Sequence, residues 1–213
     1  MAALEPLIRG RLAAHPAAPA FAAEVLRIHR RYASEIVQTY GLCPFVRDVD
    51  VAFGRFAVML DEELDLDAAR EAVLDAKNPV VHVVFPCALP PPNVFERFAS
   101  SLYKALQGKL ETPPVMAAFH PQLAGDAGAA HRLVGLLRRA PDPFVQLIPE
   151  GMNESGTVFA HVVDEETFAA PPDRSELVFQ RLQGEPLERL LATAADIRED
   201  RDRSYAPHLA MLG

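Results

Sequence analysis

Apolar residues recur along the first part of the chain with the spacing of an amphipathic helix. Between Ala20 and Tyr40 they fall three or four positions apart, at Phe21, Val25, Ile28, Tyr32 and Ile36. Side chains at this spacing share one face of a helix, which is then buried against a core. Gly41 stands where a left-handed residue would end the helix, and Pro44 prevents the helix from continuing.

After Pro44, short apolar runs alternate with further helical patterns. Runs rich in β-branched residues predict strands, at Arg55–Leu60, Val80–Phe85, Val115–Phe119, Phe144–Ile148 and Thr157–Val163. Helical spacing between them predicts helices, at Leu66–Lys77, Asn93–Gln107 and Ala129–Arg139. Asp65 is placed to cap the first of these helices, and Asn93 with Glu96 resembles a capping box. The alternation predicts an α/β layered domain with a mixed, partly parallel sheet of four to five strands.

The pattern divides the chain into three parts. Residues 1–19 are rich in alanine but interrupted by charged residues and proline, which predicts a flexible leader. Residues 20–163 form the predicted α/β core domain. Residues 164–213 predict a helical C-terminal extension, interrupted at Gly184 and Pro186. Two charged stretches, Arg27–Arg31 and Arg198–Arg203, are expected to be solvated helix surfaces.

Composition narrows the class of protein. The 213 residues are 50% hydrophobic, which is enough apolar material for a packed core. The net charge of −8 would repel phosphate backbones, so we expect no nucleic-acid partner. No window approaches the roughly 18 apolar residues that a membrane span needs, so we expect no membrane partner and a cytoplasmic location. A weak amphipathic targeting segment at the N-terminus is the alternative.

Familiar cofactor motifs do not occur in the sequence. Two cysteines exclude a disulfide scaffold and a four-cysteine zinc site. There is no glycine-rich phosphate loop, no HExxH and no GxSxG. The sequence therefore identifies neither a cofactor nor a metal, and it leaves the oligomeric state open.

Cys43, in the run Gly41–Phe45, is the first candidate for chemistry. Its thiol could act as a nucleophile or bind a metal, or it could simply fill the core, because free cysteines are among the most buried residues. A thiol just beyond the C-terminus of a helix is at the negative end of the helix dipole, which raises its pKa. A cation such as Arg47 would be needed to offset this effect.

Rigid polar residues at the ends of predicted strands supply the other candidates. His120 follows a strand and is held extended by Pro121, which suits a general acid or base, or else a hydrogen bond to a carbonyl. Arg139 precedes a proline-flanked Asp142 and could bind an anion, or compensate the dipole of the preceding helix. Because sites in α/β sheets gather at carboxyl ends of strands, we expect Pro86–Cys87, His120–Pro121 and Pro149–Glu150 to meet. Gln146 and Glu150 flank the fourth predicted strand and are candidate substrate-binding residues, as is Arg47.

Three motifs in order, Gly41–Phe45, Phe119–Pro121 and Arg139–Pro143, resemble a bacterial family known only as domain of unknown function 1415. The resemblance covers roughly residues 21–150 and places the family's cysteine, histidine and arginine on Cys43, His120 and Arg139. Two family histidines fall on Phe85 and Gln146, so this chain departs from the pattern. The resemblance sharpens the expected site but implies no particular activity.

Two functions of different classes follow. The first is a cytoplasmic small-molecule enzyme with Cys43, His120 and Arg139 as catalytic residues at the carboxyl edge of the sheet. The second is a non-catalytic binding or assembly protein that has lost the family's histidines. A metal-binding protein with Cys43, His120 and a carboxylate as ligands is a third possibility.

Overall fold

A computed structural model describes residues 5–43, 54–111, 113–149 and 174–212. The elements in chain order are β1 (Leu7–Arg9), α1 (Ala18–Arg31), the π-helix η1 (Tyr32–Gln38), β2 (Arg55–Met59), α2 (Leu66–Ala76), β3 (Val81–Val84), α3 (Pro92–Leu106), β4 (Pro114–Phe119), α4 (Ala130–Leu137), β5 (Phe144–Pro149), α6 (Arg174–Arg181) and α7 (Glu185–Leu212).

The five strands form one mixed sheet in the order β1-β2-β3-β5-β4. β1, β2 and β3 are parallel, and β5 is antiparallel to both β3 and β4, so β4 runs in the direction of the first three. The predicted α/β fold with a partly parallel sheet is confirmed. The expectation that all three strand ends meet at one edge is wrong for β5. Because β5 runs the other way, its start at Phe144 lies opposite Phe119, and its end at Pro149 lies at the far edge.

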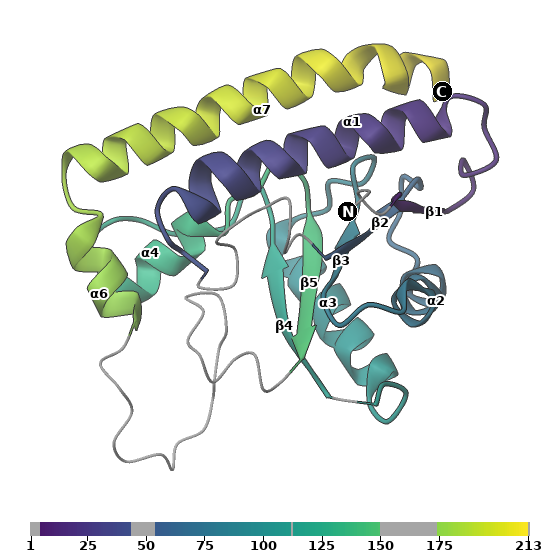
Figure 1. Cartoon of the computed structure of the whole chain (residues 1–213), viewed down its shortest axis with the longest axis horizontal. Coiled ribbons are helices and arrows are strands. Elements are labelled where there is room, and N and C mark those ends of the chain that lie inside the picture. Colours follow the sequence, from purple (N-terminus) through teal and green to yellow (C-terminus); the bar gives the residue numbers. More distant parts are fainter. Residues whose placement is uncertain (1–4, 44–53, 112, 150–173, 213) are drawn as a thin grey trace.

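Helices cover both faces of the sheet. α1 and α7 lie along one face, and α2 and α3 pack on the other (Figure 1). Strand alternation divides the core accordingly: Phe56 and Val58 of β2 join the cluster beneath α1 and α7, whereas Ala57 and Met59 join the cluster beneath α2 and α3. The two clusters are the main apolar contribution to stability, because burial removes their surface from water.

Local signals placed most helix ends correctly. Gly41 is left-handed (φ 56°) just beyond η1, and Asp65 Oδ1 accepts a hydrogen bond from the Ala68 amide at 2.9 Å. The capping box at Asn93 is wrong, because α3 begins at Pro92, one residue earlier than expected, with Pro91 as its N-cap and no side-chain cap. The predicted strand at Thr157–Val163 lies outside the described residues.

The predicted flexible leader is wrong for residues 7–9. These residues pair with β2 as the edge strand β1, in the register Leu7 with Ala57. The Arg11 amide then donates to Asp61 Oδ1 at 2.8 Å, which fixes the chain just beyond the strand. Three residues are too few to show the alternation of apolar and polar positions that is typical of a strand. The strand is therefore recognised only from its pairing with the free edge of β2.

The C-terminal extension is part of the core rather than an appendage. α7 is 28 residues long and contributes Leu187, Leu190, Ile197 and Tyr205 to the cluster beneath α1. No helix of the described residues is both long enough and apolar enough to cross a membrane.

The charged stretches that were expected to be solvated join α7 to α1. Arg27 and Arg31 of α1 donate to Asp200 of α7 at 2.8 and 2.6 Å, and Arg31 also binds Asp196 at 2.7 Å. These hydrogen bonds hold the pKa of Asp200 well below its usual value. Arginines one turn apart on one helix therefore meet aspartates one turn apart on the other, and the expectation of two free surfaces is wrong.

The chain packs closely against Asp61 just after β1, and this contact gives a test of the fold. Gly10 has φ +101°, and a β-carbon there would lie 2.1 Å from Asp61 Oδ2, whereas Gly108 has φ +67° and open space around it. We expect Gly10→Ala to lower the free energy of unfolding by at least about 1 kcal/mol more than Gly108→Ala, because both introduce backbone strain but only one introduces a clash. Urea unfolding measures both variants. Equal losses would show that residues 7–11 are not docked on the sheet.

Candidate functional site

The three predicted catalytic residues do not form one site in the described structure. Cys43 is buried in the cluster beneath α1 and α7, with 8% of its surface exposed. The His120 ring packs against Phe95, which belongs to the cluster on the other face of the sheet. Among the described residues, no hydrogen bond joins any two of Cys43, His120 and Arg139. Arg47, the cation that was expected to activate Cys43, lies outside the described residues.

His120 uses both ring nitrogens for backbone hydrogen bonds. Nε2 donates to the Pro90 carbonyl at 2.8 Å, and the Gln122 amide donates to Nδ1 at 3.1 Å. Burial lowers the pKa of His120. The neutral ring therefore ties the end of β4 to the segment before α3, as in the carbonyl-bonded alternative for this residue.

Arg139 also binds backbone. Its Nε donates to the Leu123 carbonyl at 2.8 Å and its Nη2 to the Gly125 carbonyl at 3.1 Å. Gly125 lies so close to α4 that a β-carbon there would be 2.3 Å from the Leu136 amide nitrogen. The motifs around His120 and Arg139 are therefore neighbours, joined through the loop at residues 120–125. Arg139 keeps Nη1, which makes no hydrogen bond with the described residues.

Gln146 lies in the middle of β5, opposite His82 of β3. Its Nε2 donates to His82 Nε2 at 2.9 Å, which requires a neutral His82 ring. The ring stacks on Phe56 with centroids 4.5 Å apart. Burial, with a smaller contribution from the charge of His29, lowers the pKa of His82 to about 3. Gln146 thus binds a buried histidine, and Glu150 lies outside the described residues.

A buried carboxylate that sequence reasoning did not select organises the carboxyl edge of the sheet. Asp142 is fully buried and accepts three hydrogen bonds. His29 Nε2 and the Tyr205 hydroxyl donate to Oδ2 at 3.1 and 2.9 Å, and Arg201 Nε donates to Oδ1 at 2.9 Å. Arg201 Nη2 completes an ion pair with the same oxygen at 2.9 Å. We call these four residues the Asp142 cluster. Burial by itself raises the pKa of Asp142, but the bonds from His29, Arg201 and Tyr205 outweigh burial and lower it.

The second cysteine lies near this cluster and is not activated. Cys87 is partly buried just after β3, and burial and the charge of Asp142 raise its pKa to about 11. The thiol is therefore protonated at neutral pH, which argues against a nucleophile here. No group of three or more His, Cys, Asp or Glu residues in the described ranges is arranged to hold a metal ion.

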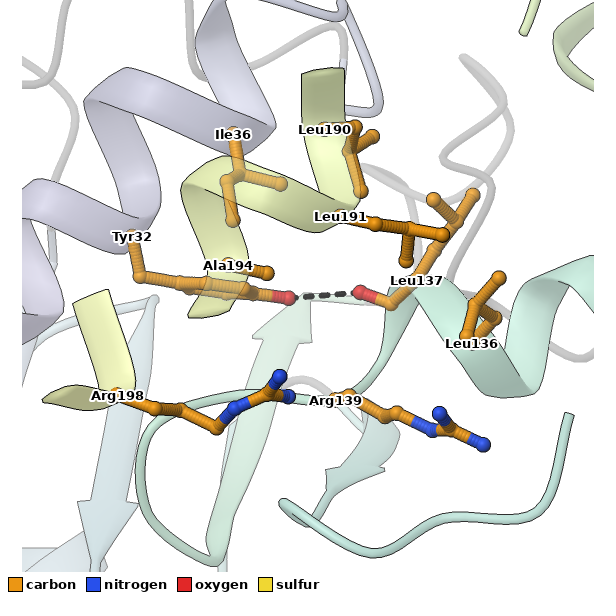
Figure 2. A pocket seen from close by; sticks show the side chains of 9 residues that line it. All are labelled: Tyr32, Ile36, Leu136, Leu137, Arg139, Leu190, Leu191, Ala194 and Arg198. Atoms are coloured by element: carbon orange, nitrogen blue, oxygen red, sulfur yellow. Dashed lines mark hydrogen bonds between the residues drawn. The ribbon is translucent and has the colours of Figure 1, made fainter. Parts of the chain in front are cut away.

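A small pocket lies between η1, α4 and α7, next to Arg139. Its volume is about 70 Å³, and it is lined by six apolar residues, Ile36, Leu136, Leu137, Leu190, Leu191 and Ala194, together with Tyr32, Arg139 and Arg198. The Tyr32 hydroxyl donates to the Leu137 carbonyl at 2.8 Å. In Figure 2 both arginine side chains lie on one side of this hydrogen bond, while Ile36 and Leu190 lie on the other.

Arg198 is the unusual residue of the pocket. It is partly buried, yet it makes no hydrogen bond or ion pair with the residues that the structure describes. The acidic residue one turn further along α7, Asp202, is bound instead to Arg201 at 2.9 Å. Ala194, one turn before Arg198, offers no charge. A partly buried guanidinium without a counter-ion is unfavourable, so this position suits an anionic ligand.

Comparisons with protein-family models, with curated proteins and with solved structures found no match. The resemblance to domain of unknown function 1415 therefore stays a prediction from motifs.

Sequence reasoning selected Arg139 but missed Asp142, Arg198 and Tyr205. Asp142 lies between two prolines in the motif Arg139–Pro143, and the sequence indicated for it only a place in a rigid loop. The available signal was the matching charge spacing of the first and last helices, which predicts that the two helices pack together. That packing places Arg198 beside α4.

The Asp142 cluster predicts a large loss of stability on removal of the charge. Asp142→Asn leaves the Arg201 guanidinium without its buried partner, and we expect the free energy of unfolding to fall by about 3 kcal/mol or more. Asp202→Asn is the matched control, because Asp202 binds the same arginine but is 71% exposed; its loss should be under about 1 kcal/mol. Urea unfolding compares the two. An Asp142→Asn protein as stable as Asp202→Asn would contradict the cluster's role.

The lowered pKa of His82 predicts that the free energy of unfolding depends on pH. The folded pKa of about 3 lies below the ordinary 6.5, so between these values the unfolded chain binds a proton that the folded chain does not. The free energy of unfolding should therefore decrease as the pH falls from about 6.5 towards 3, by at most about 1.4 kcal/mol per pH unit from this group. His82→Gln should flatten the slope, while His131→Gln, at an exposed position in α4, should keep it. Equal slopes in all three proteins would remove His82 as the cause.

Proposed function

We propose that this protein binds a small anion in the pocket between η1, α4 and α7, with Arg198 as the principal cation. The observation that carries the proposal is Arg198, a partly buried guanidinium in the pocket wall, with no hydrogen-bond or ion-pair partner among the described residues. The ligand would supply the missing counter-ion. A π-helix supplies Tyr32 and Ile36 to the same wall, and such irregular turns are frequent at functional sites.

The enzyme with Cys43, His120 and Arg139 has less support. Cys43 is buried in the apolar core, and both ring nitrogens of His120 are bound to backbone. Arg139, by contrast, lines the pocket between η1, α4 and α7. The anion-binding role considered for Arg139 is therefore kept, and the proposed protein is a binding protein rather than a cysteine-dependent catalyst. This choice agrees with the loss of two histidines that the family resemblance implies at Phe85 and Gln146.

Anion-dependent thermal stability tests the proposal. Sodium propionate and sodium phosphate are titrated against the full-length protein, with sodium chloride at matched ionic strength as the salt control. An anion at ten times its Kd stabilises the folded state by about 1.4 kcal/mol, so we expect the Tm to rise by about 3–5 °C for at least one of them. Arg198→Gln should lose this rise.

Arg189→Gln is the matched control, because Arg189 lies on the same helix and is exposed, paired only with Glu185. It should respond to the anion as the original protein does. Arg139 is left unchanged, since its replacement would release the loop at residues 123–125. If no anion raises the Tm beyond sodium chloride, or if Arg198→Gln keeps the full rise, the proposed site is wrong.

A further inference from the structure

A larger pocket lies on the face of the sheet that α2 and α3 cover (Figure 1). It is formed by the C-terminal ends of these two helices and by the edge of the sheet where β3 and β4 begin and β5 ends. Its volume is about 530 Å³, within the range of about 300–1,000 Å³ that is typical of pockets for organic ligands. Eight apolar residues line it, together with Lys77, Asn78, Lys109 and Glu111; the apolar ones are Val73, Leu74, Pro79, Val81, Leu110, Pro114, Leu147 and Pro149.

The backbone around this pocket is stiffened by three prolines. Pro114 opens β4 opposite Pro149, the last residue of β5, and Pro79 comes just before β3. A proline ring fixes one of the two backbone dihedral angles of its residue. Val81 and Leu147, which pair between β3 and β5, connect the pocket to the core cluster beneath α2 and α3. The pocket is therefore largely preformed, and a ligand would bind without first ordering these segments.

Part of the apolar surface of the pocket is in contact with solvent. Leu74 of α2 is 37% exposed, and Leu110, beyond the end of α3, is only partly buried. Covering these two side chains removes apolar surface from water, which favours binding of an apolar group.

Two of the three lysines of the chain line the pocket. The sequence contains 21 lysines and arginines, and its only lysines are Lys77, Lys104 and Lys109. Lys77 and Lys109 are exposed and make no hydrogen bond or ion pair with the residues that the structure describes. The lining includes one acidic residue, Glu111, so the pocket is positively charged in a protein of net charge −8. This local charge attracts an anionic group.

Lys77 has a backbone conformation that favours glycine. Among the described residues it is the only non-glycine residue with a positive φ, 47°, and it ends α2. Gly41 and Gly108 take the same conformation after η1 and α3. A side chain in the left-handed region costs energy, and residues held in such conformations gather at binding sites. Because glycine would end the helix with less strain, the conformation points to a role for the lysine side chain itself.

We infer that this pocket is a second binding site, for an organic acid that carries an apolar body. The anionic group of the ligand lies at Lys77 and Lys109, and its body lies against Leu74 and Leu110. The inference does not rest on the proposed anion site, because the two pockets share no residue.

Four probes with matched parts test the inference. Octanoate has both an anionic group and an apolar body, octan-1-ol and octylammonium keep the body without the negative charge, and acetate keeps the charge without the body. Each is titrated at constant ionic strength against the full-length protein, and Kd is measured from NMR chemical shifts of the backbone amides of residues 73–78 and 109–111. We expect octanoate to bind at least about tenfold more tightly than acetate, because its chain leaves water. It should also bind more tightly than octan-1-ol and octylammonium.

Lys77→Gly separates binding from stability. Glycine relieves the strain at this position, so the Tm should not fall, whereas octanoate should bind about twofold to fivefold more weakly and octan-1-ol as before. Lys109→Gln should weaken octanoate by a similar factor. Lys104→Gln is the matched control, because Lys104 is exposed on α3 and does not line this pocket; its affinity for octanoate should be that of the original protein.

Three results would overturn the inference. The first is octanoate that leaves the amides of residues 73–78 and 109–111 unshifted. The second is equal affinity for octanoate and octan-1-ol. The third is unchanged octanoate affinity in both Lys77→Gly and Lys109→Gln, and a lower Tm of Lys77→Gly would then assign that lysine a structural role. None of these results bears on the anion site at Arg198, because the amides that report binding belong to a different pocket.

Discussion

A single buried carboxylate holds the described structure together at the carboxyl edge of its sheet. Asp142 accepts from His29 of α1 and from Arg201 and Tyr205 of α7, while Arg201 also donates to the Pro86 carbonyl beyond β3 at 3.0 Å. A charge with no solvent contact is costly unless every oxygen is bound. Asp142 meets that condition only when the first helix, the last helix and the start of β5 are all in place. The constraint therefore links segments more than a hundred residues apart.

The pocket depends on this arrangement through chain geometry. Arg198 stands three residues before Arg201 on α7, and Arg139 stands three residues before Asp142 on the loop into β5. The bond between Arg201 and Asp142 thus brings the two segments together and fixes where Arg198 lies relative to Arg139. The ion pairs of Arg27 and Arg31 with Asp200 add to the same contact between helices. The proposed ligand would bind where this contact leaves a cation without a partner.

The motif residues acquire different roles in the folded chain. His120 and Arg139 are rigid polar residues at strand ends, the pattern from which catalysis was inferred. Both instead satisfy backbone carbonyls, at Pro90 and at Leu123 and Gly125. Buried carbonyls need donors, and a loop packed tightly on α4 has few others available. A polar side chain in a motif can therefore bind backbone carbonyls as readily as it binds a substrate. Which of these roles it takes depends on neighbours that are distant in sequence.

The sequence by itself determined the α/β class, the positions of β2 to β5, the helices between them and the end of the first helix at Gly41. These features follow from local periodicity and turn chemistry, which act over a few residues. Tertiary structure alone decided that residues 7–9 complete the sheet, that β5 runs antiparallel and that Asp142 is the centre of the edge. Each of these depends on which distant partner satisfies a strand edge or a buried charge, and the spacing of residues along one chain does not specify that partner.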